Sequence, residues 1–164
     1  MTSLGILVAP SGLVPLGLRD HLTDWVAAGL VKPFLWVRDD KVTVDGTEAL
    51  LIAPDGATPV QLQSYLGRVP ADELVLCVLV PAIAGAATVA PNLEGAVWQQ
   101  LGGARNNARI VPIRCLLARD FDPIKAEVGS AGWHNVVVSA EHSADPTVGI
   151  APLPPTTDPD EIGR

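Results

Sequence analysis

The sequence predicts a doubly wound α/β domain: a flavodoxin-like or Rossmann-like three-layer sandwich around a mostly parallel sheet of five or six strands with an edge hairpin. Short apolar runs alternate with stretches of helical periodicity along the chain. The segment from Glu73 to Val80 is apolar after its first residue, which is typical of a parallel strand covered on both faces. Several apolar runs end in turns rich in proline, glycine or aspartate, the residues that close strands.

The composition favours one globular domain. Of 164 residues, 48% are hydrophobic and 18% are charged. That is enough apolar chain for one core, so we expect a domain over residues 1–150 and a proline-rich, acidic tail or linker over residues 151–164.

The formal net charge of −7 argues against a nucleic-acid partner, which needs clustered basic residues. No apolar run reaches the ~20 residues that span a bilayer, so we expect a cytoplasmic protein with no membrane partner.

The first strand and helix are the clearest unit. The run from Leu4 to Pro10 predicts a strand, and the apolar positions that follow fall at helical spacing. The helix is expected to start at about residues 12–14, with Pro15 in its first turn and Ser11 as its cap, and to end at Gly29. In open α/β sheets such a turn often points at a ligand.

An edge hairpin and a further strand are expected next. Residues 33–37 predict the second strand, and the alternation over residues 41–45 predicts a strand that folds back on it. Residues 48–54 predict another strand, which ends in the turn Pro54-Asp55-Gly56.

The second half of the chain continues the alternation of helices and strands. A helix capped by Thr58, with Pro59 at its first position, is expected before the buried strand 73–80. A long connection over 81–91 leads to a helix that runs from Asn92 as cap to Gly102-Gly103. A strand over 109–119, whose regular pairing begins after Pro112, one helical turn within 121–128 and a last strand over 135–139 complete the domain.

The cysteines and tryptophans are mostly expected inside. Cys77 and Cys115 each lie in an apolar run, so we interpret both as reduced core residues. Trp25 and Trp36 fall at predicted core positions. Trp98 and Trp133 are the two tryptophans that a partner protein would most readily contact, because a partly exposed tryptophan is a common interface residue.

Polar residues at the strand ends are the candidate ligand-binding residues, because the carboxyl ends of parallel strands line the ligand crevice of this fold class. They are Ser11, Gly12, Asp55, Gly56, Asp120, Glu141 and His142. A Ser-Gly turn before a helix presents backbone N–H groups to an anion. The chain has neither the Gly-x-Gly-x-x-Gly dinucleotide pattern nor a Gly-x-x-x-x-Gly-Lys phosphate loop, so a structural turn is the simpler interpretation.

No catalytic residues, metal site or cofactor are expected. The chain contains no Gly-x-Ser-x-Gly elbow and no Cys-x-x-Cys pair. Asp120 and Asp122 supply only one pair of carboxylates on a loop, which is too few ligands for a cation site.

The leading hypothesis is therefore a non-catalytic α/β interaction or regulatory domain, the N-terminal module of a larger protein or complex, with a protein partner. The alternative is a small-molecule or nucleotide-binding enzyme domain that uses the crevice at the carboxyl ends of the strands. A third possibility is self-association through an exposed strand edge or the segment 81–91.

Overall fold

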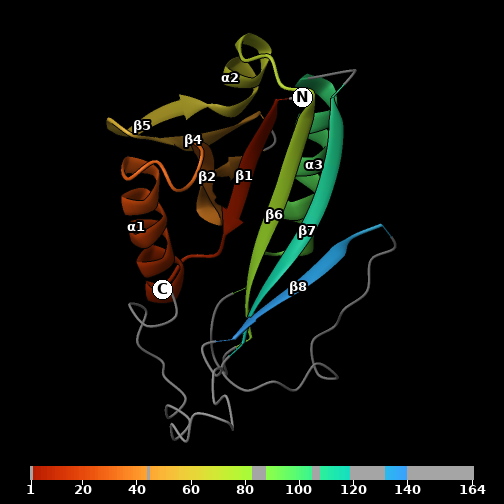
Figure 1. The fold of residues 1–164 in the computed structure, drawn as a ribbon. Coiled ribbons are helices and arrows are strands. Elements are labelled where there is room, and N and C mark those ends of the chain that lie inside the picture. The colour runs from red at the N-terminus through yellow and green to blue at the C-terminus, as the bar shows by residue number, and fades with distance from the viewer. Residues whose placement is uncertain (1, 44, 83–87, 105–107, 119–131, 140–164) are drawn as a thin grey trace, which may run out of the picture.

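The computed structural model describes residues 2–43, 45–82, 88–104, 108–118 and 132–139 (Figure 1). Within these residues the chain forms a mixed α/β structure with three α-helices and one eight-stranded, strongly curled half-barrel sheet.

The elements alternate as the sequence predicts, with an insertion of short strands in the first half. They are β1 (Ser3–Ala9), α1 (Leu13–Ala27), β2 (Phe34–Arg38), the 3-10 turn η1 (Asp39–Lys41), β3 (Val42–Thr43), β4 (Gly46–Ala53), β5 (Gly56–Gln61), α2 (Leu62–Arg68), β6 (Glu73–Ala82), α3 (Pro91–Ala104), β7 (Arg109–Ala118) and β8 (His134–Ser139).

The sheet has a parallel part and an antiparallel part. Its order is β3-β4-β2-β1-β6-β7-β8, and β5 also pairs with β4. The five strands β2, β1, β6, β7 and β8 are parallel, whereas β4 is antiparallel to β2, β3 and β5. The sheet therefore has eight strands where five or six were predicted, and five of the eight are parallel. All five parallel strands end at the same edge of the sheet.

Helices lie on both faces of the sheet. On one face Val26 of α1 packs with Trp36 of β2 and Ile52 of β4 in one core cluster. On the other face, residues of α2 and α3 pack with the centre of β1 and β6; they are Leu62, Leu66, Val97 and Leu101 against Ile6, Leu74 and Leu76. Figure 1 shows α1 beside the β2-β4 side of the sheet and α3 behind β6 and β7.

The predicted hairpin of residues 41–45 on the second strand is wrong. The strand β3 is only Val42–Thr43, and it pairs with β4 instead of β2. The edge of β2 is taken by β4, which places Leu50, Leu51 and Ile52 opposite Trp36, Leu35 and Phe34. A strand with a longer apolar run buries more surface at that position, and this decides which segment pairs there.

The predicted start of the second helix is also wrong. Residues 56–61 form β5, an edge strand joined to β4 through the turn at Pro54 and Asp55, and α2 begins only at Leu62. Gln61 takes the N-cap position of α2, with no side-chain capping bond, so Thr58 is not a cap. Pro59 is compatible with β5 because an edge strand leaves one side of its backbone unpaired.

The first helix confirms most of its prediction. It starts at Leu13 and ends at Ala27, and Gly29 follows with a φ of 74°, the left-handed conformation that closes many helices. The expected cap is wrong, because Gly12 takes the N-cap position and the Ser11 hydroxyl bonds elsewhere. Trp25 is also not a core residue: it is 37% exposed, because it lies about 100° around the helix from the buried Val26.

The later elements agree in kind and differ at their boundaries. The strands β6, β7 and β8 confirm the predicted runs, and Trp36 is buried as expected. The helix α3 starts at Pro91, one residue before the expected cap, and continues through both glycines to Ala104. Pairing of β7 with β6 includes Pro112, whereas pairing with β8 begins after it, at Ile113. The predicted helical turn within 121–128 and the tail 151–164 lie outside the described residues.

Candidate functional site

Two of the seven predicted site residues lie together where β1 passes into α1. A small pocket of about 70 Å³ is found there. Its lining consists of Pro10, Ser11, Gly12, Pro15, Leu16, Trp36 and Arg38. Because Ala9 and Arg38 are register partners at the ends of β1 and β2, this pocket lies at the carboxyl edge of the parallel strands, as predicted.

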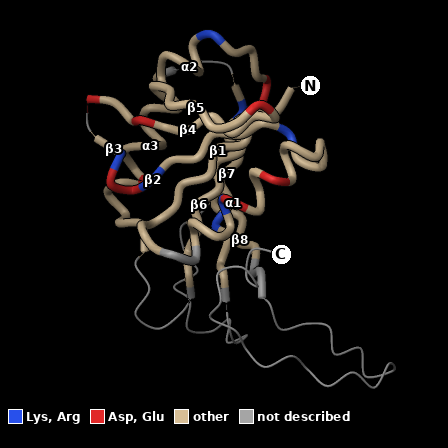
Figure 2. Tube along the Cα trace, turned by 90° about the vertical axis from the view of Figure 1, so that its left-hand side faces the viewer, with Lys and Arg blue, Asp and Glu red and all other residues tan. Residues whose placement is uncertain are grey.

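Charged groups surround the mouth of this pocket. The Ser11 hydroxyl donates to Asp39 Oδ1 at 2.8 Å, and the backbone N–H of Asp40 donates to the same oxygen at 2.8 Å. The Arg38 guanidinium pairs with Asp40 Oδ2 at 2.7 Å. Figure 2 shows these opposite charges side by side where β2 passes into β3. One cation and two carboxylates therefore stand beside the start of α1.

Asp55 and Gly56 lie at the opposite edge of the sheet. They form the tight connection between β4 and β5, and Gly56 has a φ of 125°. Because β4 runs antiparallel to β2, the end of β4 lies at the edge where β1 and β2 begin. The expectation that Asp55 and Ser11 close strands at one edge is wrong, since the sequence does not reveal that this strand is reversed.

The remaining predicted site residues, Asp120, Glu141 and His142, lie outside the described residues. Of the predicted crevice, the structure therefore brings together Ser11 and Gly12 and separates them from Asp55 and Gly56.

An apolar surface that the sequence analysis did not single out lies on the α1 side of β6, β7 and β8. We call it the open strip; it consists of Val75, Cys77, Val111, Ile113, Cys115 and Val136, which the strand register places on one face. Its residues are half-buried or, for Val136, 45% exposed. On the opposite face of the same strand β6, Leu74, Leu76 and Val78 are fully buried. Figure 1 shows no described helix over this side of β6 and β7.

The open strip deepens beside α1. A hollow of about 250 Å³ is lined there by Ser3, Gly5, Leu7, Leu22, Val31, Lys32, Pro33, Phe34 and Val75. Gly5 contributes to the hollow because it lacks a side chain on this face. A signal for this surface was present in the sequence, because the uninterrupted apolar run of β6 predicts cover on both faces, whereas Val75 and Cys77 on one face are only half-buried.

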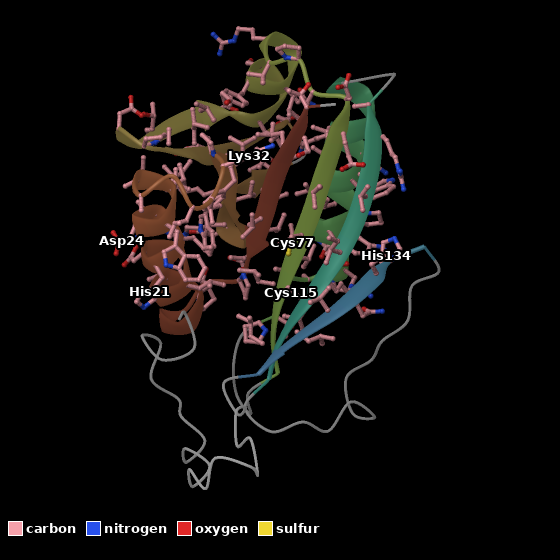
Figure 3. All side chains as sticks on the ribbon, viewed as in Figure 1. His21, Asp24, Lys32, Cys77, Cys115 and His134 are labelled. Carbon is pink, nitrogen blue, oxygen red and sulfur yellow. The ribbon has the colours of Figure 1, made fainter. Side chains whose placement is uncertain are left out.

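The two cysteines of the open strip form a hydrogen-bonded pair of free thiols. Cys77 is opposite Ile113, and Cys115 is opposite Leu79, so the two thiols meet diagonally across β6 and β7 (Figure 3). The Cys77 S–H donates to Cys115, which together with burial raises the pKa of Cys77 far above its usual range. The same hydrogen bond stabilises the Cys115 thiolate and lowers the pKa of Cys115.

Removing the donor should therefore slow alkylation of Cys115 at neutral pH. In the parent chain, the rate of iodoacetamide labelling at Cys115 is expected to rise with pH at lower values than for an ordinary thiol, because the thiolate reacts. The Cys77→Ala variant should move this rise to higher pH, and the Cys77→Ser control, which keeps a hydroxyl donor, should move it less. Identical profiles for all three chains, measured by mass spectrometry, would contradict the assigned hydrogen bond.

A polar cluster on the opposite face joins α3, β7 and the start of β8. Arg114 pairs with Glu94 at 2.7 Å, with side chains only 16% and 12% exposed, and its guanidinium lies 4.8 Å from the ring centre of Trp133. Trp133 in turn contacts Trp98, with ring centres 6.2 Å apart. Trp98 is 39% exposed, and Trp133 is half-buried. Sequence reasoning singled out Trp98 and Trp133 but missed their link to Arg114 and Glu94, because these residues meet only through the packing of α3 on β7.

The described residues offer little else for chemistry. Among them, no group of three or more histidine, cysteine, aspartate or glutamate side chains is placed to hold a metal ion. None of the described helices has the length and apolar character needed to cross a membrane. Comparison of the chain with protein-family models, with curated proteins and with solved structures gives no match.

Proposed function

We propose that this chain is a non-catalytic interaction or regulatory domain whose docking surface is the open strip. The observation that supports the proposal is the contrast within the first part of β6: Val75 and Cys77 on one face are only half-buried, whereas the neighbouring leucines on the other face are fully buried. An apolar sheet face of this kind is normally buried against a helix or another sheet. Contiguous apolar surface is also the feature that marks protein-binding sites on folded domains.

We further propose that the occupant is one α-helix of a partner protein that presents aliphatic side chains. The open strip spans three strands, and the two intervals between them amount to about 10 Å, the diameter of one helix. None of its six residues is charged, so the part of the helix over them is apolar. His134 and the Glu73–Arg109 ion pair lie on the same face at the margin of the strip and would meet polar positions of the helix. The hollow beside Leu22 and Val75 would receive the larger side chains of such a helix.

The order of the parallel strands supports a flavodoxin-like fold, in which a helix would be expected over the open strip. Numbered along the chain, the parallel strands follow the order 2-1-3-4-5, which is the flavodoxin-like order. We propose that the chain is a flavodoxin-like domain with an antiparallel insertion, β3 to β5, at one edge. In such doubly wound folds helices cover both faces, so a helix from a partner would complete the face beside α1.

Photocrosslinking in cells tests this function. A chain with p-benzoylphenylalanine in place of Val136, on the open strip, is expected to trap one partner protein, identified by mass spectrometry through a peptide from an amphipathic helix. The same residue in place of Gln63, which is exposed on α2, should not trap it. An added Ile113→Asp substitution should abolish the product, because a carboxylate in the strip opposes apolar docking. The matched Gln63→Asp substitution should not.

Other products would overturn the proposed occupant. A crosslink between two copies would assign the open strip to self-association, and a crosslink within one chain would assign it to another segment of the same protein. Absence of any product, in a chain that is folded by circular dichroism, would remove the strip as a docking surface.

A further inference from the structure

We infer that Cys77 and Cys115 form a binding site for one Cu(I) ion, held in line between their two sulfur atoms on the α1 side of β6 and β7. The site takes a soft, singly charged metal ion and needs no ligand besides two thiolates. It lies within the open strip, but the inference does not rest on the proposed function, because two neighbouring thiols bind such an ion whether or not a helix docks over them.

The fold brings both cysteines of the chain to one point. The chain contains two cysteines in all, and they lie on different strands. The register places both side chains on the same face, and Figure 3 shows them at neighbouring positions of β6 and β7. They are close enough for the S–H of Cys77 to bond to Cys115. Both are free thiols and both are half-buried, so an ion from solution reaches them.

The spacing of the two cysteines suits a bridging ion better than a disulfide. Cys77 is opposite Ile113, so Cys115 is two residues out of register with it. Residues offset in this way on neighbouring strands have Cα atoms about 8 Å apart. That exceeds the roughly 4.4 to 6.8 Å that a disulfide requires. A metal ion in line between two thiolates separates the sulfur atoms by about 4.5 Å, so two thiols in hydrogen-bond contact move only slightly to admit it.

The surroundings of the pair select the metal. Leu7 and Ile113 are the register partners of Cys77, and they offer no further ligand. Leu79, the register partner of Cys115, offers none either. Zinc takes four ligands and hard cations take six or more oxygens, but no group of three ligating side chains is found among the described residues. Cu(I) is soft, prefers sulfur and is satisfied by two thiolates, so it fits this ligand set.

The binding step exchanges protons for the metal and involves no oxidation or reduction. Two copper–sulfur bonds form, two S–H bonds break, and two protons leave to water, because a coordinating thiol loses its proton. The low pKa of Cys115 makes the first proton easy to remove. Cys77 gives up the second once the ion takes the place of its hydrogen bond to Cys115.

Competition for Cu(I) in oxygen-free buffer tests the inference. The full, reduced chain is titrated into the coloured complex of Cu(I) with bicinchoninate, and it is expected to withdraw one ion per chain, seen as loss of colour. The Cys77→Ser and Cys115→Ser variants should each bind Cu(I) about a hundredfold more weakly, because the second thiolate acts at a high effective concentration. The matched Val75→Ser variant, altered on the same face, should bind as the parent does.

A second measurement uses the parent chain alone and stays valid if a serine variant fails to fold. Bound Cu(I) should protect Cys77 and Cys115 together from iodoacetamide, as followed by mass spectrometry. Failure to withdraw copper, an unchanged affinity in either cysteine variant, or protection of only one cysteine overturns the inference. One ion per two chains also overturns it, because the two thiolates would then come from different chains. None of these results affects the crosslink expected at Val136, so this inference and the proposed function fail separately.

Discussion

Replacing Val78 with alanine is expected to lower the free energy of unfolding by about 2 to 3 kcal/mol. Val78 is fully buried in the centre of β6, in the core cluster that also contains Val97 and Leu101 of α3. Two methyl groups leave the core and a cavity remains, so the loss exceeds the transfer free energy of the methyl groups alone. Urea unfolding followed by circular dichroism measures the change.

The matched control is Val75→Ala, three residues earlier on the same strand and on the opposite face. Val75 belongs to the half-buried open strip, so the same chemical change is expected to cost less than about 1 kcal/mol in the isolated chain. Equal losses at Val75 and Val78 would mean that the strip is already covered in the isolated chain. That result would contradict its availability to a partner helix.

Replacing Arg114 with methionine is expected to cost about 2 to 4 kcal/mol. The substitution leaves the Glu94 carboxylate, only 12% exposed, without its cation, and an uncompensated charge in a site of low exposure is strongly unfavourable. It also removes the guanidinium from the face of Trp133, a contact worth about 0.5 to 2 kcal/mol. The loss should appear as a lower midpoint of urea unfolding.

Two further variants separate the ion pair from the other contacts. The double variant Arg114→Met with Glu94→Gln should recover part of the lost stability, because no buried charge remains unpaired. Arg38→Met is the control, since Arg38 pairs with Asp40 at the same 2.7 Å but with side chains 43% and 45% exposed. That exposed pair should contribute less than about 1 kcal/mol. A loss at Arg38 as large as that at Arg114 would show that burial does not set the difference.

Local patterns predicted the elements that have strong periodicity. The apolar runs of β1, β6, β7 and β8 and the stop at Gly29 follow from the sequence, because burial and glycine conformation act over a few residues. Predictions failed where two interpretations of a short segment competed. Thr58 and Pro59 suit a helix start as well as an edge strand, and pairing with β4 decided for the strand.

The candidate sites were less predictable than the fold. Ser11 and Gly12 were found because a glycine turn between a strand and a helix is a local feature. Trp36 and Arg38 were missed as site residues, since they reach the same pocket only through the pairing of β2 with β1. The pairing of Arg114 with Glu94 was missed for the same reason, because 20 residues separate them in sequence.

The sequence by itself determined that this chain forms an α/β domain with a buried parallel strand at Glu73 to Val80, because alternation and apolar content depend on local composition. Only the tertiary structure decided the direction of β4, which moves Asp55 away from Ser11, and the incomplete burial of the open strip. The direction of a strand and the cover of a sheet face depend on which distant segments compete for the same edge or surface. That competition is settled by the total area buried, which no local pattern encodes.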